Sequence, residues 1–132
     1  MKTRTVLEAK RLGIVSCKGS DPLEKIAVRI ADDDISALVV TDAQGYLSGI
    51  VSRSDLLRAY VESEDWRVEP VERFMTRGVV SVTPDATLAE AAQLLLGRHI
   101  HRVVVVRQEE GGLRPIAVLS DSDLVCDMVD AL

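Results

Sequence analysis

Two short segments hold the residues best suited to chemistry: Ser52-Arg53-Ser54-Asp55 and Ser120-Asp121-Ser122-Asp123. Each follows an apolar stretch that is typical of a strand and precedes a helical pattern. A Ser at a helix start with an acidic residue three positions later is the signature of a capping box, which satisfies the free N–H groups there. The same junction suits a ligand, because the N–H groups, the helix dipole and the Ser hydroxyls attract phosphate, and a carboxylate accepts both hydroxyls of a ribose. Both interpretations stay open, and their occurrence at two equivalent places adds weight to the ligand.

The two segments belong to an internal repeat that covers most of the chain. A shift of 65 residues lays Ile35–Val40 on Ile100–Val105, and the shift becomes 68 where Ser52 and Asp55 match Ser120 and Asp123. We therefore expect three extra residues in the turn-like Gln108–Gly112 of the second copy. Self-similarity on this scale predicts the same supersecondary unit twice.

Each copy predicts the element order β-α-β-β-α, and the fold class is therefore mixed α/β (α+β). In the first copy, Asp42–Gly45 is a hairpin signal between two strands, because Gly accepts a positive φ. An N-terminal helix over about 3–11 precedes the first copy, and 68–76 joins the two. The other expected elements are extended stretches at about 14–17 and 79–82, first helices at about 22–31 and 86–97, strands at 38–40 and 47–51, and second helices at about 53–62 and 121–131.

Composition excludes several classes of function. The 132 residues, 47% of them hydrophobic, suffice for a packed core. Only 3% of the residues are aromatic, too few for platforms on which bases could stack, and the net charge of −5 indicates no basic face. No DNA or RNA partner is therefore expected. No apolar run approaches the roughly 20 residues that span a bilayer, so no membrane is expected. Cys17 and Cys126 are too few for a disulfide scaffold. We expect a soluble, cytoplasmic protein in which both cysteines are small buried fillers.

The sequence resembles the cystathionine-β-synthase-type (CBS) domain pair, or Bateman module, from about residue 6 to 130. The resemblance rests on Ile35–Val40, on Gly49–Leu56 and on Val71–Thr76, which opens the second copy. The second copy is also similar to the AMP-binding repeats of the AMP-activated kinase gamma subunit, through His101–Val106 and Ser120–Asp123.

The resemblance implies two tandem repeats with pseudo-twofold symmetry, 1–66 with the N-terminal helix and 67–132, that form one compact module. It further implies a regulatory, non-enzymatic protein that binds an adenosine nucleotide (AMP, ADP or ATP) or S-adenosylmethionine in the cleft between the repeats, without turnover and without a required cofactor. A homodimer and an unidentified effector protein are the expected partners. The alternative is a protein-interaction or dimerisation module whose nucleotide clefts are vestigial.

Carried over residue by residue, the resemblance implies that Asp123 holds the ribose hydroxyls. Ser120, Ser122, His101 and Arg102 would face phosphate, and a guanidinium grips phosphate through two hydrogen bonds. Asp55, Ser52 and Ser54 would form the other site. The adenine base would lie against apolar residues that are otherwise core candidates, namely Ile14, Val15, Val79, Val80, Ile35 and Ile100.

The two copies differ at the proposed phosphate position. The first has Ser36-Ala37 where the second has His101-Arg102, and only Arg53 offers a substitute cation. The second has Asp121 in place of Arg53, and Ala117 in place of Gly49, where we expect a methyl group to crowd the ligand. We expect one preferred site, with Asp123 and Arg102. No metal site and no catalytic residue are expected, since His99 and His101 lack further ligands and no nucleophile elbow is present.

Overall fold

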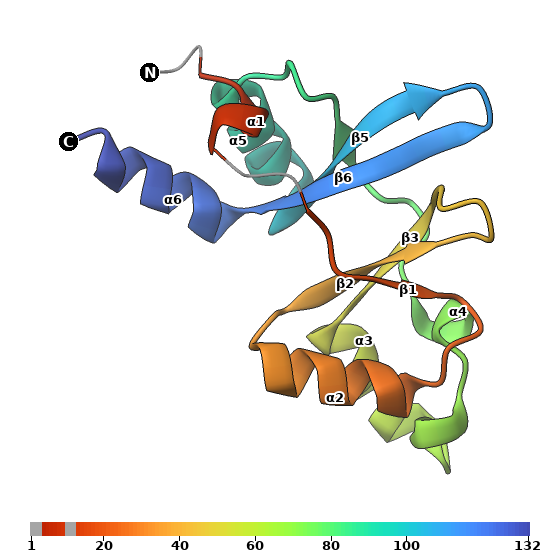
Figure 1. Cartoon of the computed structure of the whole chain (residues 1–132). Coiled ribbons are helices and arrows are strands. Elements are labelled where there is room, and N and C mark those ends of the chain that lie inside the picture. Colours follow the sequence, from red (N-terminus) through yellow and green to blue (C-terminus); the bar gives the residue numbers. More distant parts are fainter. Residues whose placement is uncertain (1–3, 10–12) are drawn as a thin grey trace. The chain divides into compact units, whose positions relative to one another are not determined.

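A computed structural model describes residues 4–9 and 13–132 (Figure 1). The predicted order β-α-β-β-α is confirmed in both copies, and two further short helices lie between the second helix of the first copy and the first strand of the second. The elements are α1 (Val6–Ala9), β1 (Ser16–Lys18), α2 (Leu23–Asp33), β2 (Ala37–Thr41), β3 (Leu47–Ser52), α3 (Arg53–Glu62), the 3-10 helix η1 (Trp66–Val68), α4 (Val71–Phe74), β4 (Ser81–Val82), α5 (Leu88–Arg98), β5 (Arg102–Glu109), β6 (Gly112–Ser120) and α6 (Asp121–Asp130).

The chain divides into two compact units. Val15–Val79 forms one, which we call the first-repeat unit; Val80–Leu132 forms the other together with the residues up to Ile14, and we call it the second-repeat unit. This division differs from the expected boundary between residues 66 and 67, and it places the N-terminal helix with the second repeat.

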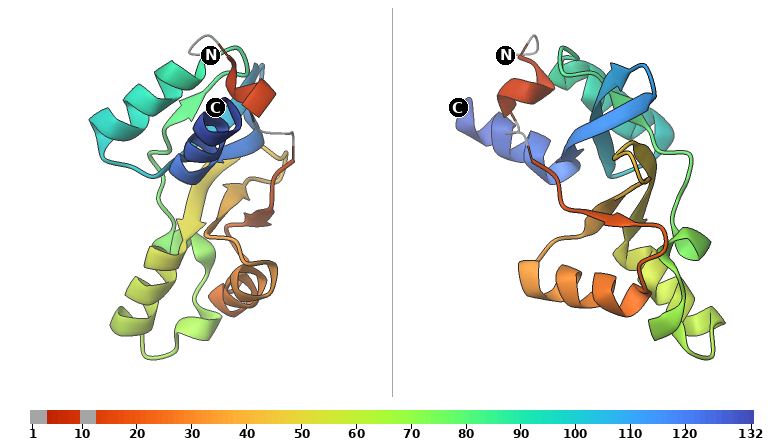
Figure 2. Two further views of the ribbon diagram at one scale, coloured as in Figure 1. Left: turned by 90° about the vertical axis from the view of Figure 1, so that its left-hand side faces the viewer. Right: turned by 45° about the vertical axis from the view of Figure 1, so that its right-hand side comes forward.

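Backbone contacts explain why the N-terminal helix joins the second repeat. The Val6 N–H donates to the Ala86 carbonyl at 2.9 Å, and the Leu88 N–H donates to the Arg4 carbonyl at 2.8 Å. Val6 is fully buried in the hydrophobic core of the second-repeat unit, and Arg4 forms a 3.1 Å ion pair with Asp127 of α6. As Figure 2 shows, α1 lies beside α5 and α6. These contacts span about 80 residues or more of chain, beyond what local pattern reveals.

The sheet of the first-repeat unit has the order β1-β2-β3, with β1 parallel and β3 antiparallel to β2. The predicted hairpin between β2 and β3 is confirmed: the Asp42 carboxylate accepts the N–H groups of Gln44 and Tyr46, each at 2.9 Å, and Gly45 has φ +87°. An Asx-type turn and a left-handed Gly thus set the register of β3.

Helices α2 and α3 lie on the same side of this sheet and enclose the first core (Figures 1 and 2). The apolar residues of α2 recur at helical spacing, and Leu23, Ile26 and Ile30 are at most 6% exposed. They pack with buried residues of β2, β3, α3 and α4, namely Leu38, Val40, Val51, Ala59, Val71 and Phe74. Burial of the Leu, Ile, Val and Phe side chains among them, each contributing roughly 1.5–3 kcal/mol, stabilises the packing of the helices on the sheet.

The second-repeat unit repeats this arrangement with a longer hairpin. Its sheet has the order β4-β5-β6, and β5 and β6 have eight and nine residues where β2 and β3 have five and six. The extra residues lengthen the two strands at the hairpin end, where Gly112 has φ +152°, so the longer hairpin lies where the insertion was predicted. Both first helices end alike, since Asp34 and His99 each take the left-handed conformation after α2 and α5.

Among the described residues, we find no helix with the length and apolar character needed to cross a bilayer.

Candidate functional site

The two Ser-x-Ser-Asp segments occupy equivalent strand-to-helix junctions. β3 runs into α3 after Ser52, and β6 runs into α6 after Ser120; both Ser residues are extended N-caps. Asp55 Oδ2 accepts the Ser52 N–H at 2.9 Å, and Asp123 Oδ2 accepts the Ser120 N–H at 2.8 Å. The capping-box interpretation is therefore confirmed at both places, and a ligand would have to share these carboxylates with the helix start.

The carboxylates at the two junctions differ in their surroundings. Asp55 is 3% exposed, and its second oxygen, Oδ1, faces the Arg58 Nη1 at 3.3 Å. Asp123 is half-buried. Ser54 and Ser122 are exposed in the first turns of α3 and α6, whereas Ser52 and Ser120 are half-buried.

His101, Arg102 and Ser120 converge in the second-repeat unit. Arg102 is directly opposite Ser120 in the pairing of β5 with β6, and the Asp121 N–H donates to the His101 carbonyl at 2.9 Å. The backbone thus places His101, Arg102 and Ser120 at the junction that Asp123 caps. This is the grouping that the sequence predicted for one binding site.

Asp121 pairs with His101 across this junction. The His101 Nδ1 and an Asp121 carboxylate oxygen are 3.0 Å apart, and the side chains are 77% and 53% exposed. The hydrogen bond from His101 is the main reason that the pKa of Asp121 lies below its ordinary value. The carboxylate that the sequence placed beside the proposed phosphate therefore accepts a hydrogen bond from the neighbouring imidazole.

The first repeat has the basic Arg53 where the second has the acidic Asp121. The Arg53 N–H donates to the Ser36 carbonyl at 3.2 Å, which matches the backbone contact between residues 121 and 101. The Arg53 guanidinium lies 3.6 Å from the Asp34 carboxylate. Both side chains are exposed, so this ion pair contributes little and leaves the proposed role of Arg53 untouched.

The apolar candidates for the adenine base are half-buried. Val15 and Ile35 pack against the core of the first-repeat unit, and Val80 and Ile100 against that of the second. Each unit thus brings together one pair of the predicted residues. Ile14 and Val79 lie where the chain passes from one unit to the other, at the last positions before Val15 and Val80.

Gly49 has a different role from the one expected. A Cβ at this position would lie 2.7 Å from the Thr76 carbonyl oxygen and 2.9 Å from the Met75 sulfur. Ile50 and Thr76 exchange backbone hydrogen bonds of 2.9 and 2.8 Å. The chain itself therefore requires Gly here, whereas Ala117, at the matching place, is 1% exposed within the second core. The structure gives no support to crowding of a ligand by the Ala117 methyl group.

Sequence reasoning missed Arg58 and Phe74. Arg58 Nη2 donates to the Phe74 carbonyl at 2.6 Å, and its guanidinium lies over the Phe74 ring, 5.7 Å from the centroid. Arg73 lies 5.5 Å from the same centroid. The spacing of Asp55 and Arg58, three residues apart on a helix, was the available signal for part of this cluster.

Two further predictions concern the burial of the cysteines and a metal site. Cys17 is buried, as expected, but Cys126 is exposed on α6, so the prediction of two buried fillers is wrong for Cys126. In the described part of the chain, no three His, Cys, Asp or Glu side chains form a group that would hold a metal ion.

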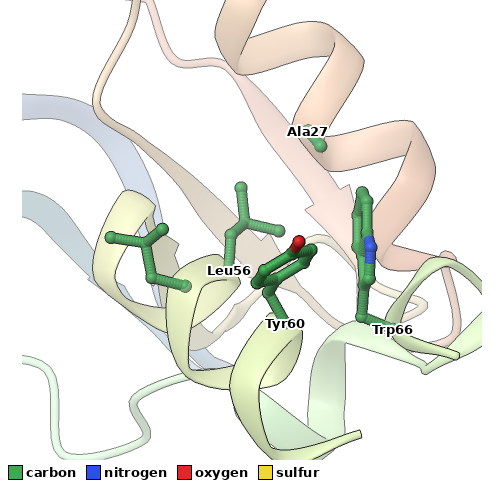
Figure 3. A pocket seen from close by; sticks show the side chains of 5 residues that line it. Ala27, Leu56, Tyr60 and Trp66 are labelled. Atoms are coloured by element: carbon green, nitrogen blue, oxygen red, sulfur yellow. The ribbon is translucent and has the colours of Figure 1, made fainter. Parts of the chain in front are cut away.

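Trp66 of η1 covers part of α2 and α3. With apolar residues of these helices it encloses a hollow of about 170 Å³ (Figure 3). The other lining residues are Ala27, Leu56, Leu57 and Tyr60.

Two β-α-β-β-α units with capping boxes at matching junctions define a tandem-repeat architecture, and comparison with known proteins identifies its family. The protein-family model that describes the CBS domain matches residues 9–62 and 71–129 of the sequence. The chain belongs to the CBS domain family, as its sequence resemblance indicated.

Individual relatives are distant in sequence and close in fold. The chain is 26% identical over 99 residues to an uncharacterized 17.7 kDa protein of Acidianus ambivalens, covering 75% of this chain and 58% of that relative, so it spans less than two thirds of that protein's length. The crystal structure of the CBS-domain containing protein ATU1752 from Agrobacterium tumefaciens is 26% identical, with a TM-score of 0.80 over 92% of this chain and 94% of that one.

A second solved structure shares the fold at lower identity. The CBS domain pair of protein MJ0100, solved in complex with 5-methylthioadenosine and S-adenosyl-L-methionine, has a TM-score of 0.87 and 18% identity, and covers 98% of this chain and 99% of that one.

Proposed function

We propose that this CBS pair is a regulatory module that binds an adenosine-containing ligand and does not transform it. One arrangement carries the proposal: the strand pairing of Arg102 with Ser120 and the backbone contact of Asp121 with His101 bring these basic and hydroxyl residues to the junction that Asp123 caps. Such groups suit a sugar phosphate. The adenosine ligands of MJ0100, a protein with the same fold, support the class of ligand.

The proposed roles follow the chemistry of each side chain. Asp123 accepts the ribose hydroxyls, while Ser120, Ser122, His101 and Arg102 bind phosphate. Asp55, Ser52 and Ser54 form the weaker counterpart in the first repeat. The apolar residues Ile14, Ile35, Val79 and Ile100 are the proposed contacts of adenine. The Arg102 guanidinium favours the phosphate of AMP, ADP or ATP over S-adenosylmethionine, which carries a positive sulfonium.

Calorimetric titration of the purified protein with AMP, ADP, ATP and S-adenosylmethionine tests the proposal. We expect saturable binding of at least one nucleotide and a rise in the melting temperature, because a ligand that binds only the folded state stabilises it by mass action. Recovery of the nucleotide unchanged after incubation is the expected result for a non-enzymatic module. A flat response to all four compounds would remove the proposal.

A second candidate function is protein association with vestigial nucleotide sites. It is favoured by exposed apolar side chains on two helices, because such patches mark interaction surfaces. On α3, Leu57, Tyr60 and Val61 are 66–81% exposed, and on α6 the corresponding residues are Val125, Met128 and Val129. We propose that a second copy of the chain covers at least one of these faces. We also propose that an effector protein binds the module in the cytoplasm.

Sedimentation equilibrium tests the association. We expect a homodimer that Tyr60→Glu weakens, and no change with Arg98→Glu, an exposed residue at the end of α5. A monomer at all accessible concentrations would contradict the dimer.

A further inference from the structure

We propose that nucleotide binding at the junction of β6 and α6 places a proton on Nε2 of His101, so that the affinity for AMP rises as the pH falls from about 8 to about 6. This inference deepens the proposed function and rests on it.

The contact between His101 and Asp121 fixes where the imidazole carries its proton. His101 Nδ1 lies 3.0 Å from Asp121 Oδ2. The hydrogen bond from His101 is the main cause that lowers the pKa of Asp121 from its ordinary value of 3.8, so at neutral pH this carboxylate is ionised and can only accept. Nδ1 is therefore the donor, and in the neutral imidazole the other nitrogen, Nε2, carries no proton.

A neutral imidazole that donates to Asp121 cannot also donate to phosphate. Phosphate oxygens are acceptors, and so is an unprotonated Nε2. Among the described residues, Asp121 is the only hydrogen-bond partner of the His101 ring, and the side chain is 77% exposed, so Nε2 can take a proton from solvent. The protonated ring donates to phosphate from Nε2 while Nδ1 keeps its bond to Asp121.

The charge of Asp121 makes this proton favourable for binding. Without the proton, the His101–Asp121 pair carries one negative charge beside the proposed phosphate, and with the proton the pair is neutral. The first repeat has the basic Arg53 at the position of Asp121, so it has no carboxylate there to offset. The second repeat thus offsets its additional carboxylate with a proton whose binding depends on pH.

The other charged or titratable residues of this region are Arg98 and His99 at the end of α5, Arg102 at the start of β5 and Asp123 in the first turn of α6. Arginine stays protonated across this pH range, and the ordinary pKa of a carboxyl lies near 4. Histidine is the side chain whose ordinary pKa falls within the range. His99 and His101 are the two histidines of the chain, so His99 supplies the matched control.

Calorimetric titration with AMP in two buffers of unlike ionisation enthalpy measures the protons taken up on binding. At about pH 7 we expect the wild type and His99→Asn to take up a similar fraction of a proton per AMP, and His101→Asn to take up clearly less. Asn tolerates the left-handed conformation that His99 adopts, φ +53°, and its amide at residue 101 can still donate to Asp121. The AMP phosphate itself titrates near pH 6, and this contribution is common to the three proteins.

The affinity gives a second readout of the same proton. From about pH 8 to about pH 6 we expect the Kd of the wild type to fall at least about threefold more than that of His101→Asn, within the limit of about tenfold per pH unit for one linked proton.

Asp121→Asn tests the part played by the carboxylate. The new amide oxygen can still accept the Ser122 N–H, which donates to Asp121 at 2.8 Å. At about pH 8 AMP should bind this variant more tightly than the wild type and with less proton uptake, because the negative charge is gone and the neutral ring is free to carry its proton on Nε2. Equal affinity at that pH would contradict the unfavourable charge of Asp121.

Absence of proton uptake by the AMP-binding wild type would overturn the inference, as would equal uptake by His99→Asn and His101→Asn, while the proposed function would stand. No binding of AMP to the wild type between about pH 5.5 and about pH 8 would overturn the proposed function and this inference with it. If His101→Asn binds no AMP, NMR titration of the two wild-type imidazoles decides. A titration of His101 that AMP moves to higher pH supports the inference, and one that AMP leaves in place contradicts it.

Discussion

Gly49 and Thr76 approach so closely that a single added carbon would meet the Thr76 carbonyl oxygen at 2.7 Å. The contact ties β3 to the segment that follows α4, and it lies within one unit. Side-chain volume at residue 49 therefore controls whether this segment can pair with the edge of the sheet.

Gly49→Ala should destabilise the protein by about 1–3 kcal/mol, the usual range for overpacking a site that cannot yield. Chemical denaturation measures the change. Gly78→Ala is the control, since a Cβ there has no neighbour within 4 Å, and it should change stability by less than about 0.5 kcal/mol. Equal stability of Gly49→Ala and the wild type would show that the 75–76 segment moves away at little cost.

Asp123→Ala should weaken AMP binding by at least about 1.5 kcal/mol, the lower range for hydrogen bonds to a charged group, or roughly tenfold in Kd. Asp130→Ala, at the exposed far end of α6, is the control for the helix. Because Asp123 also caps α6, the melting temperature of each variant is measured without ligand as well. An unchanged Kd would move the ribose to another carboxylate.

The His101–Asp121 pair gives a pH-dependent contribution to stability. Hydrogen bonding from His101 lowers the pKa of Asp121 in the folded state from its ordinary value of 3.8. The unfolded state therefore binds a proton first as the pH falls, so the contribution is present above pH 3.8 and is lost as the pH falls through the lowered value. NMR titration of the Asp121 carboxyl should show this, and His101→Ala should raise the pKa toward 3.8. Identical titration in both proteins would contradict the contact.

The two cysteines should differ sharply in reactivity. Burial is the main cause that raises the pKa of Cys17 from 9.0 to about 11, whereas Cys126 is exposed. At pH 8 a thiol reagent should modify one cysteine quickly and the other slowly, and Cys126→Ser should remove the fast phase, because the thiolate is the reactive form. Two fast phases in the wild type would show that Cys17 opens readily.

The same shift predicts alkaline destabilisation. Between pH 9 and 11 the unfolded state loses the Cys17 proton and the folded state retains it, so the free energy of unfolding falls as the pH rises. Cys17→Ala should flatten this part of the curve, which denaturation at several pH values measures. A curve of the same slope in both proteins would assign the loss to other groups.

Val6→Ala should destabilise the second-repeat unit by about 1–3 kcal/mol, because Val6 is fully buried in its core. Hydrogen exchange should show lost protection in β5 and α5 and unchanged protection in β2. Val28→Ala, at a site 54% exposed on α2, is the control. Lost protection in β2 would place the N-terminal segment with the first repeat after all.

Local pattern and repetition predicted most of the secondary structure. The offset between Ile35 and Ile100 located the strands, and the pairs Ser52 with Asp55 and Ser120 with Asp123 marked the helix starts correctly. Capping and turn signals act within three or four residues, so a single sequence displays them.

Contacts between distant residues were beyond the same reasoning. Nothing in the pattern around Val6 indicates that it pairs with Ala86, and nothing local indicates that Arg58 contacts a carbonyl 16 residues away. The burial of Asp55, which distinguishes it from the half-buried Asp123, emerged only from the structure.

The division of the chain into two units also affects the order in which the units can fold during synthesis. Residues 4–9 are synthesised before Val15–Val79 and α6 is synthesised after it, yet both belong to the second-repeat unit. Val15–Val79 holds all of its own strands and can fold while synthesis continues. The segment 4–9, in contrast, can complete its packing only after the second repeat has been synthesised, because Val6 is buried in the core of that repeat.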